Sequence, residues 1–324
     1  MVPVSRRVRA YFAPFDHNTN QPAVFDPGKQ GAFLLEAAPA PWIDLGEIEN
    51  FRRTSGSEVG AITAGPRGAM AGQFRKSLDA QVEFHFREWG KLQMALAGGS
   101  QHMNVLACDP DAGARPSGGI PVAAVGALDG STASEVFVGA GTVDAFAVGE
   151  MLAIDVDYEQ QTGWVGTGIS AAYVRDPADV LRDKDYVRRV TFNVGRVAGK
   201  TATSLLLAQP LPGGDPASTA GVQKVVAFVD REGGSSFQDW SALFVHEEES
   251  GGRICVYYPH LSATRSSRTG TDGHEGETGS MIQEPLVAVR LHAVFRALPS
   301  VDENDGEMVL CYRSYFPAEM SALY

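Results

Sequence analysis

The residues that could carry out catalysis do not have the spacing that catalysis requires. The segment Gly56–Gly60 contains a serine, but a nucleophile elbow places serine at the centre of Gly-x-Ser-x-Gly, and here Ser57 comes one position too early. The segment Gly166–Gly168 lacks the third glycine of a dinucleotide-binding turn. His246 precedes three glutamates but has no second histidine four residues later, so the zinc-protease pattern fails. The sequence therefore predicts no catalytic, cofactor-binding or metal-binding residues.

One pair of carboxylates leaves an enzymatic alternative open. Asp155 and Asp157 alternate with apolar residues, so both should lie on one face of a strand. Two carboxylates at a suitable separation can act as general acid and base in glycoside hydrolysis. The wet side of an ordinary strand gives the same pattern, and no nucleophile, base and orienting residue can be assembled around them. We therefore rank a β-rich hydrolase last and predict that the protein is not an enzyme.

The composition is that of a globular protein with many short strands. Of its 324 residues, 44% are hydrophobic and 20% are charged, a balance typical of folded domains. The chain also contains 36 Gly and 18 Pro, which favour strands joined by turns over long helices. The three cysteines are widely spaced and form no CxxC pair, so neither a disulfide framework nor a zinc site is expected.

The charge balance opposes tight binding of nucleic acid. The chain has 27 basic and 39 acidic residues, a net charge of −12, whereas gripping a polyanion requires basic groups that replace its counterions. Solubility is the simplest explanation of this acidity. A more specific explanation is a surface along which DNA slides without binding. No apolar run is long enough to span a membrane and no signal peptide is evident, so we expect synthesis in the cytoplasm.

Strict alternation predicts two strands that each have one buried and one wet face. In the segment 81–87 the apolar residues point one way, and the polar residues, including Glu83 and His85, point the other way. The segment 286–298 alternates similarly, with Arg290 and His292 on its polar face. These four polar residues are the candidates for a functional surface.

The chain is expected to have a mainly β fold with three parts. Residues 1–32 carry prolines among polar residues and are expected to form an extended arm. Residues 33–118 and 220–324 form one discontinuous β domain, with a short helix over Trp89–Ala97. Residues 119–219 contain short apolar runs separated by turns, which predicts an inserted small β module. Such an insertion adds little loop-closure entropy.

Three segments together resemble the tail tube (major tail) proteins of bacteriophages and of related contractile injection machines. They are Trp42–Phe51, then Gln73–Phe84 with the short helix that follows, and Ile254–Pro259 with the C-terminal strands. The resemblance covers residues 33–107 and 222–317 and consists of patterns of residue type. It leaves the inserted module unexplained, since simple tube subunits are shorter.

The resemblance implies a tail-tube-like β-sandwich or β-barrel subunit with a flanking helix. Six copies would form a ring, long strands would join into one continuous barrel around a channel, and rings would stack into a hollow tube that conducts DNA. The expected location is therefore the virion tail, with the protein made in the host cytoplasm. DNA would pass without specific binding, no membrane would be involved, and the family has no catalytic residues to carry over.

The expected partners are copies of the chain itself, together with sheath or baseplate proteins. On this interpretation Glu83, His85, Arg290 and His292 face the channel or a neighbouring subunit. The alternative is another phage tail or baseplate protein, in which the module over residues 119–219 binds carbohydrate.

Overall fold

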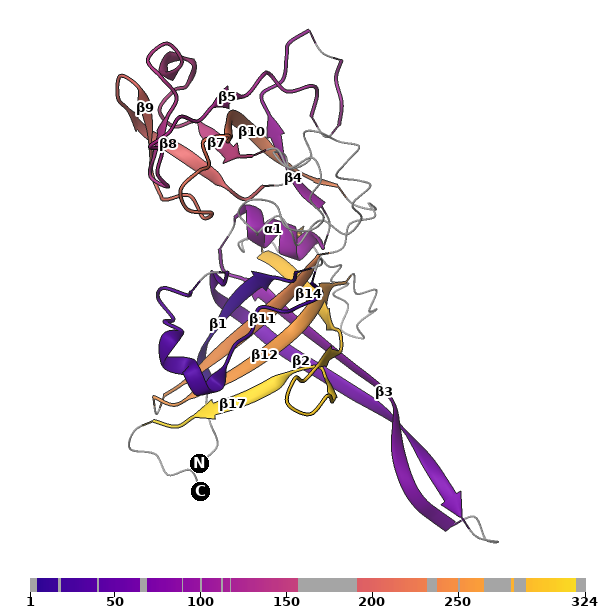
Figure 1. The fold of residues 1–324 in the computed structure, drawn as a ribbon. Coiled ribbons are helices and arrows are strands. Elements are labelled where there is room, and N and C mark those ends of the chain that lie inside the picture. Colours follow the sequence, from indigo (N-terminus) through magenta and orange to yellow (C-terminus); the bar gives the residue numbers. More distant parts are fainter. Residues whose placement is uncertain are drawn as a thin grey trace.

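The fold is mainly β with one short α-helix, as predicted. The computed structural model describes residues 5–16, 19–39, 41–64, 69–88, 90–99, 101–111, 113–116, 118–156, 191–231, 238–249, 251–264, 281–282 and 290–318. Two larger sheets lie at opposite ends of the molecule with the helix between them, and a long pair of strands leaves one sheet (Figure 1). Among the described residues, no helix has the length and apolar character that crossing a membrane would take.

The first sheet closes on itself. Its strands pair antiparallel in the order β14–β3–β2–β1–β11–β12, and the end of β12 pairs again with β14 through Leu261–Ala263. The expected sandwich or barrel is therefore a closed ring of strands. The strands are β1 (Ser5–Pro14), β2 (Ile43–Ala64), β3 (Ala69–Phe86), β11 (Asp239–Glu248), β12 (Arg253–Ala263) and β14 (Arg290–Ala297). Two strands extend the sheet outside the ring: β13 (Met281–Ile282) on β14, and β17 (Tyr312–Phe316) on β12.

Aromatic rings fill the barrel. Alternation along each strand sends every second side chain inward, so Phe12, Phe84, Phe244 and Phe295 converge with ring centroids 5.3 to 6.2 Å apart. Trp240 packs edge-on to Phe12 at 6.1 Å and is fully buried. Burying such rings is the largest stabilising contribution that this core makes.

Part of the outer wall of the barrel is also covered by protein. Residues 19–39, here called the strap, contain the 3-10 helix η1 (Pro27–Ala32) and lie against β1, β11 and β12. Phe25 packs against Tyr257 beneath it, and the hydroxyl of Tyr257 donates to the carbonyl of Ala23 at 2.8 Å. The strap therefore gives the barrel a second apolar layer on this side.

The N-terminal residues differ from the extended arm that the sequence indicated. Residues 5–14 form β1, which pairs with both β2 and β11 in the middle of the barrel sheet. Both faces of Ala10–Ala13 are buried, because one face points into the barrel and the other lies under the strap. This segment is therefore part of the barrel.

The second sheet has its own core and extends beyond residues 119–219. Its order is β4–β10–β7–β8–β9–β6, with β5 also paired to β10. The strands are β4 (Gln101–Leu106), β5 (Val125–Gly126), β6 (Glu135–Phe137), β7 (Met151–Asp155), β8 (Val194–Lys200), β9 (Ser204–Leu207) and β10 (Gly221–Arg231), and the 3-10 helix η2 (Val143–Ala145) follows β6. Strands β4 and β10 were expected in the discontinuous domain, but they complete this sheet instead.

Helix α1 (Lys91–Gly98) lies between the two sheets and packs against both β14 and β4. It ends at Gly99, whose positive φ of 56° is a common helix stop. The expected helix over Trp89–Ala97 is confirmed in this shorter range, and Trp89 lies outside the described residues. Phe192, which lies just before β8 of the second sheet, packs into the barrel core. The two parts of the molecule are therefore joined by side-chain packing.

A buried polar network crosses this junction. The Lys91 amine, beside the rings of Phe192 and Phe228, donates to Asn104 Oδ1 at 2.7 Å and to the carbonyl of Thr191. The Asn104 amide also donates to that carbonyl, at 2.9 Å, while the Thr191 hydroxyl donates to Asp155 Oδ2 at 2.6 Å. Burial lowers the pKa of Lys91 well below its usual value, because a charged amine is poorly solvated there.

Candidate assembly surface

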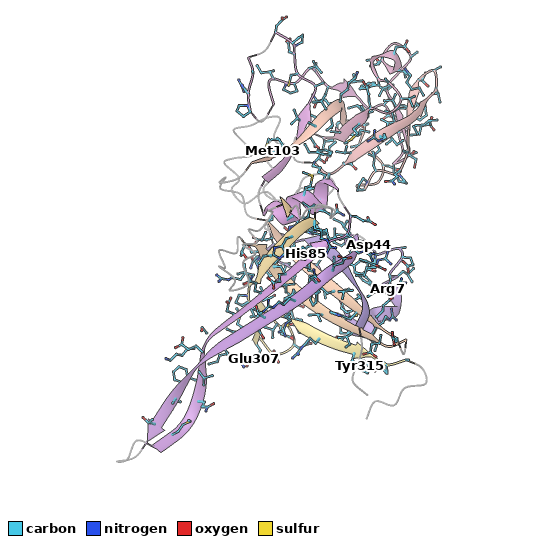
Figure 2. All side chains as sticks on the ribbon, turned by 180° about the vertical axis from the view of Figure 1, so that it is seen from behind. Arg7, Asp44, His85, Met103, Glu307 and Tyr315 are labelled. Atoms are coloured by element: carbon cyan, nitrogen blue, oxygen red, sulfur yellow. The ribbon has the colours of Figure 1, made fainter. Side chains whose placement is uncertain are left out.

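The four candidate residues lie together on the outer wall of the barrel. Strands β3 and β14 are neighbours, with His292 directly opposite His85, and Glu83 and Arg290 lie two residues away on the same face. The two imidazole rings stack with centroids 4.7 Å apart and an interplanar angle of 22°. His85 is labelled in Figure 2, above the point where the long pair of strands leaves the barrel. The structure therefore brings the four residues together on one face of the sheet.

The histidine pair is held in its neutral form. Burial lowers the pKa of His85, and the neighbouring His292 and Arg290 lower it further, because a positive charge disfavours a second one nearby. Burial is also the main cause of the lowered pKa of His292. Neutral rings can stack without repulsion, so this part of the wall carries no charge of its own at neutral pH.

Arginine and glutamate side chains cover the rest of this wall in alternating ion pairs. Arg290 contacts Glu49 at 3.1 Å, and Glu49 also contacts Arg87 at 3.4 Å. Arg87 pairs with Glu47 as well, while Arg52 pairs with Glu83 at 3.5 Å. Each exposed pair stabilises the fold by at most ~1 kcal/mol. Their main effect is that opposite charges balance, so these arginines present no uncompensated basic patch to a nucleic acid.

The pair of strands β2 and β3 continues far beyond the barrel. These strands have 22 and 18 residues, but β1 pairs with β2 only as far as Ile48, and β14 pairs with β3 only as far as Gln81. Past these points, among the described residues, β2 and β3 pair only with each other. We call the segments 55–64 and 69–80 the ribbon, and Figure 1 shows it running away from the barrel.

The ribbon exposes apolar side chains in an ordered arrangement. Phe74 lies directly opposite Gly60, and Ile62 lies opposite Gly72, so each large side chain covers a glycine across the pair. The Phe74 ring lies so close over Gly60 that a Cβ there would be 2.5 Å from it. The ribbon's large apolar residues are about half exposed: Val59 51%, Ile62 52%, Met70 59%, Phe74 49% and Leu78 39%.

A two-stranded ribbon of this kind is incomplete in water. An isolated hairpin is marginally stable at best, and it needs a third strand or an apolar surface to become stable. Its two outer edges also present backbone groups that another chain can pair with. The alternation in the sequence did not reveal how far these two strands extend beyond the barrel. Gly60 and Gly72, which lie opposite Phe74 and Ile62, were the sequence feature that could have indicated this long strand pair.

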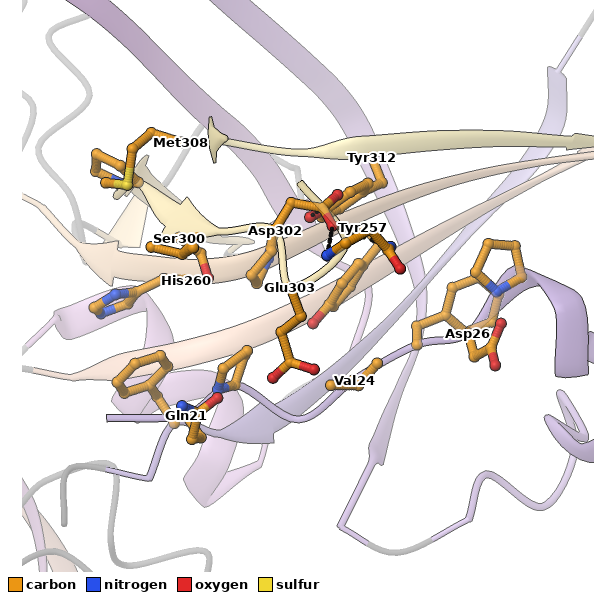
Figure 3. A pocket seen from close by; sticks show the side chains of 18 of the residues that line it. Gln21, Val24, Asp26, Tyr257, His260, Ser300, Asp302, Glu303, Met308 and Tyr312 are labelled. Atoms are coloured by element: carbon orange, nitrogen blue, oxygen red, sulfur yellow. Dashed lines mark hydrogen bonds between the residues drawn. The ribbon is translucent and has the colours of Figure 1, made fainter. Parts of the chain in front are cut away.

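A groove of about 1000 Å³ lies on another part of the barrel, between the strap and the turn that joins β15 (Ser300–Val301) to β16 (Met308–Val309). Three exposed apolar side chains line it, Val24 at 69%, Val301 at 58% and Met308 at 57%. Tyr257 and Tyr312 stack beneath them, with centroids 5.8 Å apart (Figure 3).

The groove has an acidic lining. Three acidic residues, Asp26, Asp302 and Glu303, line it together with Arg313 and His260. The backbone N–H of Asn304 and the hydroxyl of Tyr312 donate to Asp302 and lower its pKa, which keeps it ionised. Glu303 points into the open space in Figure 3. No sequence pattern indicated this groove, because its residues come from separate segments of the chain.

Of the two carboxylates of the enzymatic alternative, only Asp155 belongs to the described residues. Asp155 is 6% exposed, and burial raises its pKa to about 6. Its oxygens accept hydrogen bonds from the Thr191 hydroxyl and from the backbone N–H of Val156. Asp157 and Gly166–Gly168 lie outside the described residues. Within the described ranges, no three His, Cys, Asp or Glu side chains are grouped so that they could hold a metal ion.

No family model matches this chain, and no curated protein matches it.

Proposed function

We propose that this chain is a structural subunit that assembles with copies of itself, and that its assemblies are the rings and stacked tube of a phage tail or a related injection machine. The observation that carries the proposal is the ribbon, a two-stranded extension whose half-exposed apolar side chains have no third partner among the described residues. Assembly explains this exposed apolar surface, because on a monomer the same surface would promote aggregation.

Two further features support a tube over other assemblies. The ion-paired wall with Glu83, His85, Arg290 and His292 carries balanced charge, and a net charge of −12 repels a polyanion. A conduit for DNA needs a surface that does not hold phosphate groups, since each contact with a phosphate adds affinity. The second sheet, at the other end of the molecule from the ribbon (Figure 1), would lie outside the tube wall.

The direct test is the assembly state of the purified chain. We expect light scattering to show oligomers whose mass rises with concentration, and negative-stain electron microscopy to show rings or tubes. The double substitution Ile62→Ser and Phe74→Ser should raise the concentration needed for assembly by about tenfold or more, since burying two half-exposed apolar side chains stabilises a contact by ~1.5 kcal/mol or more.

A matched control separates the ribbon from general surface hydrophobicity. Leu128 and Val148 are exposed apolar residues in connections between strands of the second sheet, at 49% and 61%, and Leu128→Ser with Val148→Ser should leave assembly unchanged. If the wild-type chain stays monomeric at every concentration, the proposed function is wrong. If both double variants weaken assembly equally, the ribbon has no special part in it.

A further inference from the structure

The chain carries two exposed apolar surfaces at different places, the ribbon and the groove. Both come from the same barrel, but the ribbon runs away from it (Figure 1) and therefore does not fill its own groove. The groove is bounded by the strap on one side and by the β15–β16 turn on the other (Figure 3). Two unlike surfaces on one chain are the requirement for a head-to-tail contact between copies.

The two surfaces are complementary in their apolar side chains. The ribbon presents Phe74 and Ile62 from one face, and the groove presents Val24, Val301 and Met308 around a floor of stacked tyrosines. In each strand of the ribbon every second side chain points to the same face, so the apolar side chains form a row. Such a row fits an open groove better than a closed pocket. Methionine is also well suited to an aromatic neighbour such as Phe74.

The two surfaces are also complementary in charge. The ribbon carries Arg75 and Lys76 against Glu58 and Asp79, and the two acids pair with Lys76 at 3.2 Å and with Arg296 of the barrel at 3.3 Å, so Arg75 is the cation of the ribbon that remains for a partner. The lining of the groove is acidic, with Asp302 and Glu303 beside Asp26, which pairs with Lys29 at 3.6 Å. Opposite charges around an apolar contact favour this pairing and disfavour ribbon against ribbon or groove against groove.

We propose that the groove between the strap and the β15–β16 turn is the docking site for the ribbon of a second copy of this chain. This inference rests on the proposed function and names the contact through which copies join. Because a ribbon meets a groove, each bound copy leaves one ribbon and one groove free, so the contact propagates from copy to copy. It explains why the groove is acidic and why Val24, Val301 and Met308 are exposed.

The experiment uses two variants that each lose one surface. The ribbon variant carries Ile62→Asp and Phe74→Asp, and the groove variant carries Val24→Asp and Met308→Asp. All four side chains are about half exposed or more, so the substitutions should leave the barrel folded, which circular dichroism checks. Each variant alone should be monomeric. An equimolar mixture should form a heterodimer with twice the 34.5 kDa chain mass and nothing larger, because one intact ribbon meets one intact groove.

The outcomes separate the two proposals. If the wild-type chain assembles and the groove variant assembles equally well, the docking site is wrong but the proposed function stands. If both variants are monomeric and their mixture also stays monomeric, the two surfaces do not meet each other and the docking is likewise overturned. If the wild-type chain does not assemble, both proposals fail. A control with Leu128→Asp and Val148→Asp should assemble as the wild type does.

Discussion

The substitution Asp155→Asn should make the protein more stable at neutral pH and should remove part of its pH dependence. In the folded chain the Asp155 carboxylate is almost fully buried, and its oxygens accept from the Thr191 hydroxyl and the Val156 N–H. Burial outweighs these bonds and raises its pKa from 3.8 to about 6. Asparagine has the shape of the protonated acid, with one oxygen for Val156 and one donor group toward Thr191.

The magnitude follows from this pKa shift. A group whose pKa is raised on folding contributes stability that is fully present below its unfolded value and is lost as pH rises through its folded value. For Asp155 the window therefore runs from about pH 4 to about pH 6, and a shift of about two units corresponds to roughly 3 kcal/mol. The variant should exceed the wild type by roughly 3 kcal/mol at pH 8, and by roughly half of that at pH 5.

The assay is urea unfolding of both proteins from pH 8 to pH 5, followed by fluorescence. The difference between the two free energies of unfolding isolates Asp155, since the lowered pKa values of His85, His246 and His292 affect both proteins equally. The substitution Asp129→Asn, at an exposed carboxylate, is the matched control. A difference that is constant between pH 8 and pH 5 would refute the reasoning, because it would mean that Asp155 binds no proton in this range.

Two further substitutions test the barrel and the ribbon separately. Phe84→Ala removes a fully buried ring that contacts Phe12, Phe244 and Phe295, so the free energy of unfolding should fall by about 3–5 kcal/mol; a loss below about 1 kcal/mol would contradict the packed core. Gly60→Val places a side chain where the Phe74 ring lies, so the ring must move away. Thermal unfolding should then shift little, while light scattering should show weakened assembly; unchanged assembly would mean that Phe74 need not lie over Gly60.

The alternation of side chains predicted the barrel wall well, because one face of these strands is buried and the other is wet. Phe84 and Phe86 point into the core, while Glu83 and His85 lie on the outer wall, as their spacing indicated. The same rule failed for Ala10–Ala13, where both faces are buried, one inside the barrel and one under the strap. A strand with two buried faces shows no alternation, so the sequence could not distinguish it from an arm.

Strand neighbours were the second feature that the sequence could not supply. Alternation shows which face of a strand is buried, but it does not show which strand lies beside it. Strands β4 and β10 were therefore placed in the barrel domain, although they pair with each other and β10 pairs with β7. The buried network from Lys91 to Asp155 was equally hidden, because its members lie far apart in the chain and meet only where the two sheets join.

The closed ring of strands limits how copies of this chain can join. Strands of the ring have a partner on each side, so a neighbouring copy cannot extend the sheet there without opening the barrel. Among the described residues, the long unpaired edges are those of the ribbon, where β2 and β3 pair only with each other. A continuous sheet through several copies, as the resemblance implied, would therefore run through the ribbon edges or through the outer edge of β17, which pairs only with β12 among the described strands. The ribbon face with Phe74 would remain available for the groove, because the edges of a strand pair and its faces are separate surfaces.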